Sequence, residues 1–206
     1  SKGHGPAAYY AVLAAKGFIP AEWLDDLAGP DSRLGHHPDR LLVPGVEIGS
    51  GSLGHGLGLG IGTALGLRAQ GFLTPRVYVL VGDAELDEGA VWEAVLDPMV
   101  AELGEVVWVV DLNRQSLDRV VPMMGATRLQ GMFAAAGWQV LTVKYGRLLE
   151  ELFARPGGAA LRDRIDAMSN PEYQRLLRHD PTDLRRLLPG DGPGAAEVAA
   201  LIADLP

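Results

Sequence analysis

Cysteine, cationic clusters and long hydrophobic runs are all missing from this sequence, and each absence excludes a class of protein. Without cysteine the chain can form neither disulfide bonds nor thiolate metal sites, which agrees with a cytoplasmic protein. The 18 Lys and Arg are outnumbered by 26 Asp and Glu, so the net charge is −8, and no basic cluster offers a nucleic-acid surface. The most apolar stretch, residues 53–67, holds six glycines and is too short to span a bilayer. We therefore expect neither nucleic acid nor a membrane as a partner.

What the sequence does contain is a pair of apolar runs that both end in polar residues. The run 77–81 leads into Asp83, and the run 106–110 leads to Asn113. Such runs are typical of strands buried in a parallel sheet, and open α/β sheets bind ligands at the carboxyl ends of their strands. A carboxylate and an amide oxygen at that edge suit Mg²⁺, with phosphate oxygens and water in its other positions. The alternative is a solvated acidic turn after a core strand.

Strands alternate with helices over most of the chain, which predicts an α/β fold with a doubly wound, mainly parallel sheet. Helices are expected at residues 7–15, 54–70, 90–103 and 128–136, and a third strand at 138–143. Three strands are few for such a sheet, so we expect it to be incomplete. Beyond about residue 147 we expect only short helices, at residues 148–154, 160–168, 171–177, 183–188 and 195–203.

A glycine-rich segment, residues 49–56, opens the second of these helices. Within the helix, glycine recurs every four residues on one face, at Gly54, Gly58, Gly62 and Gly66. Each glycine inside a helix costs about 0.5–1 kcal/mol relative to alanine, so we expect another backbone or a cofactor to pack against this face. A flexible linker is the alternative, but it would expose the intervening leucines.

The same glycines also fit a nicotinamide-binding Rossmann unit. Gly49, Gly51 and Gly54 form the G-x-G-x-x-G fingerprint, and Asp83 supplies an acid at the end of the next strand. Two observations count against this alternative. The strand before the glycines is very short, and the fingerprint gives no role to Asn113 or to the other acids of the 83–88 loop.

Five motifs in sequence order carry a family resemblance. They are residues 1–4, 35–39, 44–47, 50–56 and 82–89. Together they resemble the diphosphate-binding half of the transketolase family of thiamine diphosphate enzymes. From Asn113 onward, residues 113–118, 131–138 and 170–174 resemble the homodimeric-type first component of pyruvate dehydrogenase instead. The resemblance implies that residues 1–206 form one diphosphate-binding domain with a helical tail from about residue 147. Its implied fold is the three-layer α/β/α thiamine diphosphate-binding fold, with a mainly parallel and incomplete sheet.

The resemblance also implies which residues hold the metal and the cofactor. Mg²⁺ would bind the side chains of Asp83 and Asn113 and the backbone carbonyl of Gln115, and would anchor the diphosphate of thiamine diphosphate. Further cofactor contacts are implied for the backbone N–H groups of Gly82 and Ala84, and for the backbone beside the aminopyrimidine at Gly51 and Leu53.

Three residues match candidate catalytic positions of the family. His4 and His37 match histidines that reach the substrate, where a ring nitrogen near neutral pKa suits proton exchange. Glu88 resembles the family glutamate that faces its counterpart region across the subunit interface. The alternative for each histidine is an ordinary loop residue at the surface.

The sequence departs from the family pattern in ways that affect the predicted partners. Ala84 stands where the family usually has glycine, and His55 where many relatives have glutamine. The segment that precedes the first motif in relatives and the strand that closes their sheet are not found. Nor is the pyrimidine-binding domain, which carries the glutamate that activates the cofactor. We therefore expect a partner chain or domain that supplies this half, in an oligomer.

For the reaction, the resemblance leaves three alternatives. The later segments favour a first component of a 2-oxo acid dehydrogenase, which decarboxylates a substrate such as pyruvate and passes on the acyl unit. The second is transketolase-type transfer of a two-carbon ketol unit, for which only Arg33 and Arg40 lie near the motifs as cations for a ketose phosphate. The third is a non-catalytic regulatory paralogue that binds the cofactor, which the alanine at position 84 keeps open.

Overall fold

The computed structural model describes residues 1–113, 115–116, 119–120 and 126–205. The chain divides into two compact units. Unit 1 comprises Ser1–Leu117 with Ala135–Trp138, and unit 2 comprises Asp118–Ala134 with Gln139–Pro206. The assignment of residues 1–206 to one domain stays a prediction.

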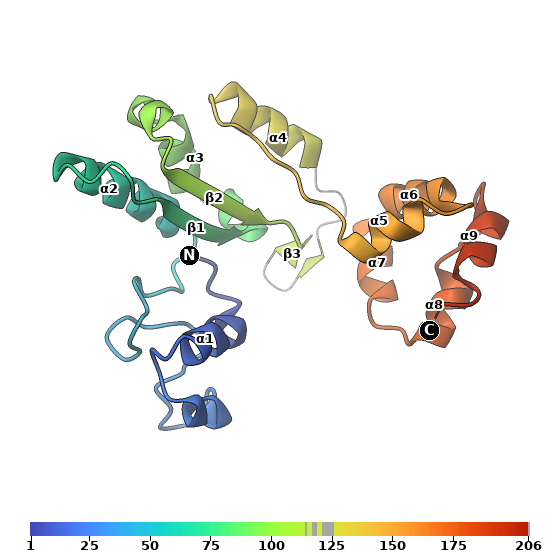
Figure 1. Cartoon of the computed structure of the whole chain (residues 1–206), viewed down its shortest axis with the longest axis horizontal. Helices are drawn as coiled ribbons and strands as arrows, with labels where there is room; N and C mark the ends of the chain where they lie inside the picture. The colour runs from blue at the N-terminus through green and yellow to red at the C-terminus, as the bar shows by residue number, and fades with distance from the viewer. Residues whose placement is uncertain (114, 117–118, 121–125, 206) are drawn as a thin grey trace. The chain divides into compact units, whose positions relative to one another are not determined.

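The centre of unit 1 is a pair of parallel strands, β1 (Val77–Gly82) and β2 (Val106–Asp111), which lie side by side in Figure 1. They pair in register from Val77 opposite Val106 to Gly82 opposite Asp111. Both strands consist mainly of β-branched and aromatic residues, which fit a pleated, packed surface. The two predicted strands and the α/β class with a small, incomplete parallel sheet are therefore confirmed.

Helices α2 (His55–Ala69) and α3 (Gly89–Leu96) flank this sheet in unit 1. The predicted helix 90–103 is wrong in its length, because the chain leaves the helix at Asp97 and resumes as a 3₁₀ turn, η3 (Pro98–Glu102). Proline disfavours a helical conformation in the residue before it. Asp97 is extended, with φ −63° and ψ 122°, and its carboxylate accepts a hydrogen bond from the Met99 N–H at 2.9 Å.

The glycines of α2 that pack against other parts of unit 1 are not the predicted set. A Cβ at Gly60 would collide with Val79 of β1, so glycine allows the helix to lie close to the strand. At Gly58, Gly62 and Gly66, by contrast, a Cβ would meet no described atom within 4 Å. Of the predicted face, Gly54 at the N-cap does pack against a neighbour, Glu88, but the covering predicted for the other three glycines is not found among the described residues.

The predicted third strand at residues 138–143 is wrong. The described residues of this segment form no strand, and the side chains that alternation would place on one face, Leu141 and Val143, are 82% and 92% exposed. A strand requires a neighbouring backbone for its hydrogen bonds. Local β-propensity is present in this segment, but it pairs with no strand among the described residues.

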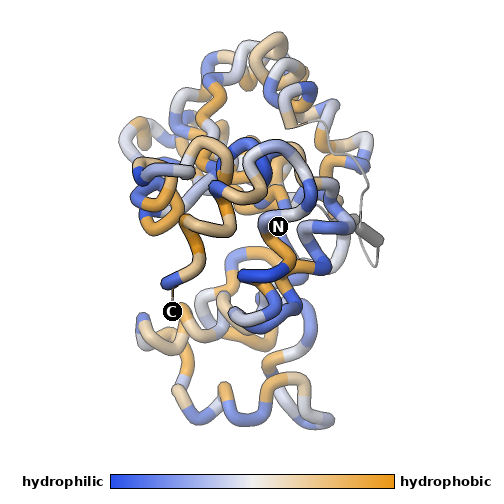
Figure 2. Tube along the Cα trace, turned by 90° about the vertical axis from the view of Figure 1, so that its right-hand side faces the viewer, coloured by the Kyte–Doolittle hydropathy of each residue, from blue (hydrophilic) through white to orange (hydrophobic). Residues whose placement is uncertain are grey.

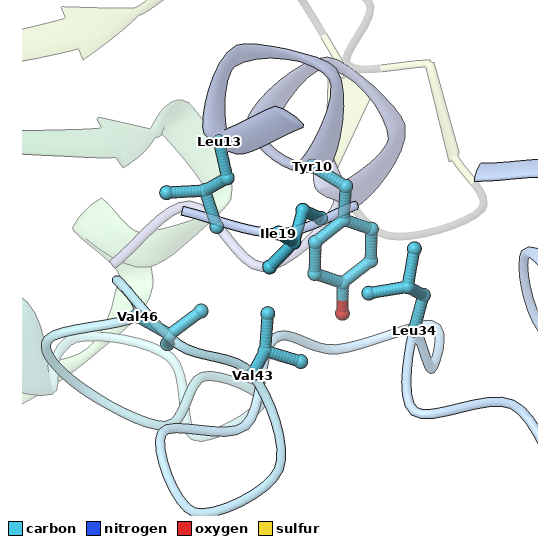
Figure 3. Close-up of a cluster of buried hydrophobic side chains, with 6 residues drawn as sticks. All are labelled: Tyr10, Leu13, Ile19, Leu34, Val43 and Val46. Atoms are coloured by element: carbon cyan, nitrogen blue, oxygen red, sulfur yellow. The ribbon is translucent and has the colours of Figure 1, made fainter. Parts of the chain in front are cut away.

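The first part of unit 1 has its own small core beneath α1 (Pro6–Ala15) and the 3₁₀ helix η1 (Ala21–Asp26). Figure 3 shows its buried side chains gathered between α1 and the following loops: Tyr10, Leu13, Ile19, Leu34, Val43 and Val46. Burial of these apolar groups fixes two irregular loops on one helix. The loop that carries His37 begins directly after one of these core residues.

Unit 2 is mainly helical, as predicted for the tail. Its tail helices are α5 (Arg147–Phe153), α6 (Gly158–Ala167), α7 (Asn170–Leu176), α8 (Pro181–Leu187) and α9 (Ala195–Ile202). Ser169 and Asp180 cap α7 and α8 by accepting hydrogen bonds from N–H groups three residues ahead, each before a proline in the first turn. Buried Leu152, Leu161, Val198 and Ile202 form the core.

Three short elements complete the described chain. They are β3 (Gln115–Ser116), β4 (Arg119–Val120) and α4 (Ala126–Ala135), the last at the place predicted for a helix. Figure 2 shows hydrophobic and hydrophilic residues interleaved along the chain. No described helix has the length and hydropathy needed to cross a membrane.

Candidate functional site

The predicted metal ligands lie where the two paired strands end. Asp83 directly follows the last residue of β1, and Asn113 follows β2 by two residues, so both lie at the same edge of the sheet. Asp83 is only 3% exposed, and its Oδ1 accepts a hydrogen bond from the Ala84 N–H at 3.0 Å. Strand β3, which contains Gln115, contacts the 3₁₀ helix η2 (Asp83–Asp87). The three predicted ligands therefore converge on one edge.

The first residues of the chain run along the same edge, an arrangement that the sequence analysis missed. The Lys2 N–H donates a hydrogen bond to the Leu80 carbonyl at 2.8 Å, and the Lys2 ammonium forms an ion pair with Asp111 at the end of β2. These contacts attach the motif of residues 1–4 to the sheet. The negative charge of Asp111, two residues before Asn113, is thereby balanced by the Lys2 ammonium.

Three motifs that are distant in sequence meet at Gly3. This glycine is buried, and a Cβ added to it would lie 2.9 Å from His37 Nδ1, 3.2 Å from Ser50 Oγ and 3.4 Å from the Gly51 nitrogen. A side chain at this position would therefore force the histidine and the glycine loop apart. The rings of His4 and His37 lie 5.7 Å apart. The two predicted histidines are therefore brought together beside the glycine loop.

Tyr10 hydrogen-bonds to the loop that carries His37. The Tyr10 hydroxyl donates a hydrogen bond to the Gly35 carbonyl at 3.0 Å. Burial, and secondarily the charge of Asp39, raise the pKa of Tyr10. The hydroxyl therefore keeps its proton and can continue to donate to the loop that presents the histidine.

Glu85 is the functional candidate that the sequence analysis left without a role. It is 1% exposed, and its two oxygens accept hydrogen bonds from the Gly54 N–H at 3.0 Å and the Gly82 N–H at 3.1 Å. The Ser1 hydroxyl also donates to this carboxylate. A signal was present in the sequence, because Glu85 lies three residues after Gly82, which is the spacing of the glutamate in a helix capping box.

The remaining predicted residues lie around the glycine loop. Gly51 has φ +121° and Gly54 has φ +81°, conformations that favour glycine. A Cβ on Gly54 would lie 2.6 Å from the Cβ of Glu88, which is exposed at the start of α3. Leu53, half-buried, lies between these glycines. Glu88 therefore packs against the loop predicted to contact the cofactor.

Two of the predicted cofactor contacts are already engaged within the loop. The Gly82 N–H donates to Glu85, and the Ala84 N–H donates to Asp83. A diphosphate could use these N–H groups only by sharing them, so their role stays a prediction. The Ser50 hydroxyl differs, since it is buried and has no hydrogen-bond partner among the described residues.

The three predicted metal ligands fit a magnesium ion bound together with a diphosphate better than a metal held by protein alone. The described residues contain no group of three or more His, Cys, Asp or Glu that could hold a metal ion. The converging set has one carboxylate, one amide and one backbone carbonyl, all hard oxygen donors. Mg²⁺ is typically held by few protein ligands, with phosphate oxygens and water completing its coordination.

Several known proteins are similar to this chain in sequence. Residues 1–156 match the family described as transketolase, thiamine diphosphate binding domain. Ferredoxin fas2 of Rhodococcoides fascians is 46% identical over 144 residues, which are 69% of this chain and 45% of that protein. A subunit of the apulose-4-phosphate transketolase of Actinobacillus succinogenes is 42% identical over 117 residues, 57% of this chain and 42% of that one.

Solved structures give the same result. A transketolase variant from Pichia Stipitis superposes with a TM-score of 0.62 and 28% identity, over 69% of this chain and 23% of that chain. The matched part of this chain spans less than half the length of each of the two relatives above, 45% and 42%. The match over residues 1–156, together with the converging motifs, shows that the chain belongs to the family of transketolase thiamine diphosphate binding domains.

Proposed function

We propose that this chain binds thiamine diphosphate with Mg²⁺ and is one half of an enzyme that transfers a two-carbon ketol unit. The observation that carries the proposal is the shared edge of the sheet, where Asp83 and Asn113 follow the paired ends of β1 and β2. One of the two relatives reported above is named as part of an apulose-4-phosphate transketolase, which supports a transferase.

The residues of this chain would hold the cofactor and handle protons. Asp83, Asn113 and the Gln115 carbonyl would bind the metal, and the metal would hold the diphosphate. When bound, thiamine diphosphate supplies the carbon nucleophile for cleavage of the bond next to a ketone. His4 and His37, whose rings lie close together, would bind substrate oxygens and exchange protons with them.

A second chain would complete the site. The chain spans 45% and 42% of the two relatives reported above, and one of them is named as a subunit. We propose a partner chain that carries the pyrimidine-binding half, in an oligomer. The isolated chain should show no turnover, and activity should appear when a chain with that half is added. Steady turnover by the chain alone would contradict the two-chain assembly.

The 2-oxo acid reaction has weaker support. No relative reported above is named for it, and one of the three sequence segments that favoured it, residues 113–118, lies partly outside the described residues. For ketol transfer, a ketose phosphate substrate would need cationic side chains to bind its phosphate. Arg33 lies over the Trp23 ring, 5.1 Å from its centroid, while Arg40 is exposed. Because one relative is named as part of a transketolase, ketol transfer is our first choice. An assay that shows 2-oxo acid decarboxylation instead would replace it.

The metal site can be tested on cofactor affinity. Asp83→Ala should raise the dissociation constant of thiamine diphosphate, measured by calorimetry with Mg²⁺, at least about tenfold, or about 1.4 kcal/mol. The matched control is Asp163→Ala, which removes an exposed acid from α6 of unit 2. Unchanged affinity in Asp83→Ala would remove the metal assignment.

The reaction can be tested with two parallel assays of the assembled enzyme. One offers a ketose phosphate and an aldose acceptor, and the other offers pyruvate with an artificial electron acceptor. We expect turnover in the first alone. Turnover in the pyruvate assay alone would overturn the ketol-transfer proposal, and binding without turnover in either would favour the regulatory paralogue.

A further inference from the structure

Three segments of the candidate site are joined through one buried carboxylate. Glu85 accepts hydrogen bonds from Gly54 at the end of the glycine loop, from Gly82 at the end of β1, and from the Ser1 hydroxyl. The Ser1 hydroxyl in turn accepts a hydrogen bond from the Gly56 N–H at 3.3 Å. Burying a carboxylate is costly unless hydrogen bonds compensate it. These donors provide that compensation.

Each of the three segments carries a different part of the proposed site. Gly82 precedes the metal ligand Asp83, Gly54 ends the loop that follows Gly51, and the segment that starts at Ser1 leads to His4. We propose that Glu85 is a positioning residue, which holds the metal loop, the glycine loop and the histidine segment in fixed relation. Glu85 would act through these backbone groups without touching the cofactor.

The geometry requires both oxygens of a carboxylate. Gly54 donates to Oε2 and Gly82 donates to Oε1, so one oxygen serves each loop. Glutamine has the same shape but only one acceptor oxygen, and its NH₂ group would face an N–H donor. Glu85→Gln must therefore release one of the two loops, while it introduces no cavity and removes a buried charge.

The glycine loop depends on this anchor more than an ordinary loop would. Gly54 adopts φ +81°, and a Cβ there would clash with Glu88, so no side chain can hold this position by packing. A backbone hydrogen bond to a charged acceptor is about twice as strong as a neutral one. Loss of that bond should loosen the loop locally, with β1 and its apolar contacts intact.

The direct test is amide hydrogen exchange, measured by NMR on the full chain. In Glu85→Gln we expect the amide of Gly54 or Gly82 to exchange about tenfold faster, and its proton resonance to move, while core amides such as that of Val81 keep their rates. Glu93→Gln, on α3 outside the network, is the matched control and should change neither glycine. Unchanged Gly54 and Gly82 amides in Glu85→Gln would overturn the proposal.

Two further measurements separate positioning from general stability. The dissociation constant of thiamine diphosphate with Mg²⁺ should rise about tenfold in Glu85→Gln, while the urea midpoint changes little. Equal acceleration of all core amides, with a lowered midpoint, would mean a merely structural residue and would overturn the proposal. The affinity readout alone rests on the proposed function. If the wild-type chain bound no thiamine diphosphate, that function would fail, and the amide readout would still decide the role of Glu85.

A milder variant keeps the test open if Glu85→Gln does not fold. Ser1→Ala removes one donor to the carboxylate and the acceptor for the Gly56 N–H. We expect the amide of Gly56 to exchange about threefold faster or more, with Gly54 affected less. If the Gly56 amide is unchanged in Ser1→Ala, the network does not hold these segments and the proposal is wrong.

Discussion

Unit 1 buries carboxylates and has a helix face that meets no described neighbour, whereas unit 2 packs leucines inside and keeps its ion pairs near the surface. In unit 1, Asp83 and Glu85 are 3% and 1% exposed and accept backbone hydrogen bonds. In unit 2, the ion pairs of Arg147 with Glu151 and of Arg162 with Glu150 are exposed. Exposed pairs contribute little, about 0–1 kcal/mol, while buried carboxylates are costly to keep.

The comparison indicates how each unit should respond to mutation. The cost of burying acids at the end of a strand is offset where these acids bind a metal or accept hydrogen bonds from binding loops. The residues assigned to the proposed site lie in unit 1. Substitutions of these residues should therefore alter cofactor affinity. Changes in unit 2 should alter stability alone.

The largest expected effect is a core truncation in unit 2. Leu161 is 1% exposed and belongs to the cluster with Leu152 and Val198. Leu161→Ala should lower the free energy of unfolding of unit 2 by about 2–5 kcal/mol, measured by urea denaturation with circular dichroism. Under conditions where the variant is folded, its affinity for thiamine diphosphate should match the wild type. A matching loss of affinity would break the comparison between the units.

The second prediction uses two glycines of the same helix in unit 1. A Cβ at Gly60 would collide with Val79, so Gly60→Ala should destabilise unit 1 by about 1–3 kcal/mol through overpacking. A Cβ at Gly58 meets no described atom within 4 Å, so Gly58→Ala should stabilise the chain by about 0.5–1 kcal/mol through helix propensity. Urea midpoints of the two variants should move in opposite directions. A shift in the same direction would show that the packed face of α2 is assigned wrongly.

The opposite behaviour of these glycines shows what sequence could and could not predict about α2. The spacing of four residues correctly placed Gly58, Gly62 and Gly66 on one face, but it did not say which face is buried. The apolar positions Leu57 and Ile61 carry that information, since both are buried. Periodicity of the large apolar residues is thus a better guide to the packed side than periodicity of the small ones.

Elements with strong local signals were predicted well. The strand 77–81 was clear from its continuous apolar, mostly β-branched run, and the helix expected at 171–177 is present as α7. The strand predicted at 138–143 had a similar composition but finds no partner edge among the described residues, because strand pairing is not a local property. The break at Pro98 had a local signal, which the apolar pattern around it obscured.

The site divides in the same way. Asp83 and Asn113 could be placed at one edge from sequence, because parallel strands bring their carboxyl ends together. The ion pair of Lys2 with Asp111 and the contacts of Glu85 with Gly54 and Ser1 could not, since they join segments that only the folded chain brings together. The sequence thus predicted the candidate ligands, and the structure added contacts that join their segments.

The smallest expected effect concerns an ion pair of unit 2 that is less exposed than the others. Arg164 hydrogen-bonds to Glu172 and holds the pKa of that carboxyl below its ordinary value of 4.5. Their side chains are 18% and 30% exposed, so solvent screens the pair and its contribution should stay below about 1 kcal/mol.

The pH dependence of this pair follows from the direction of the shift. A carboxyl whose pKa is lower in the folded state contributes stability that is fully present above 4.5 and is lost as pH falls through the folded-state pKa. Glu172→Gln should therefore lower the urea midpoint slightly at about pH 7 and have a smaller effect at about pH 3. The control is Glu151→Gln, because Glu151 is 52% exposed in its pair with Arg147 and its removal should have a smaller effect at both pH values. If the two variants lost equal stability at neutral pH, the partial burial of the Arg164 pair would make no energetic difference.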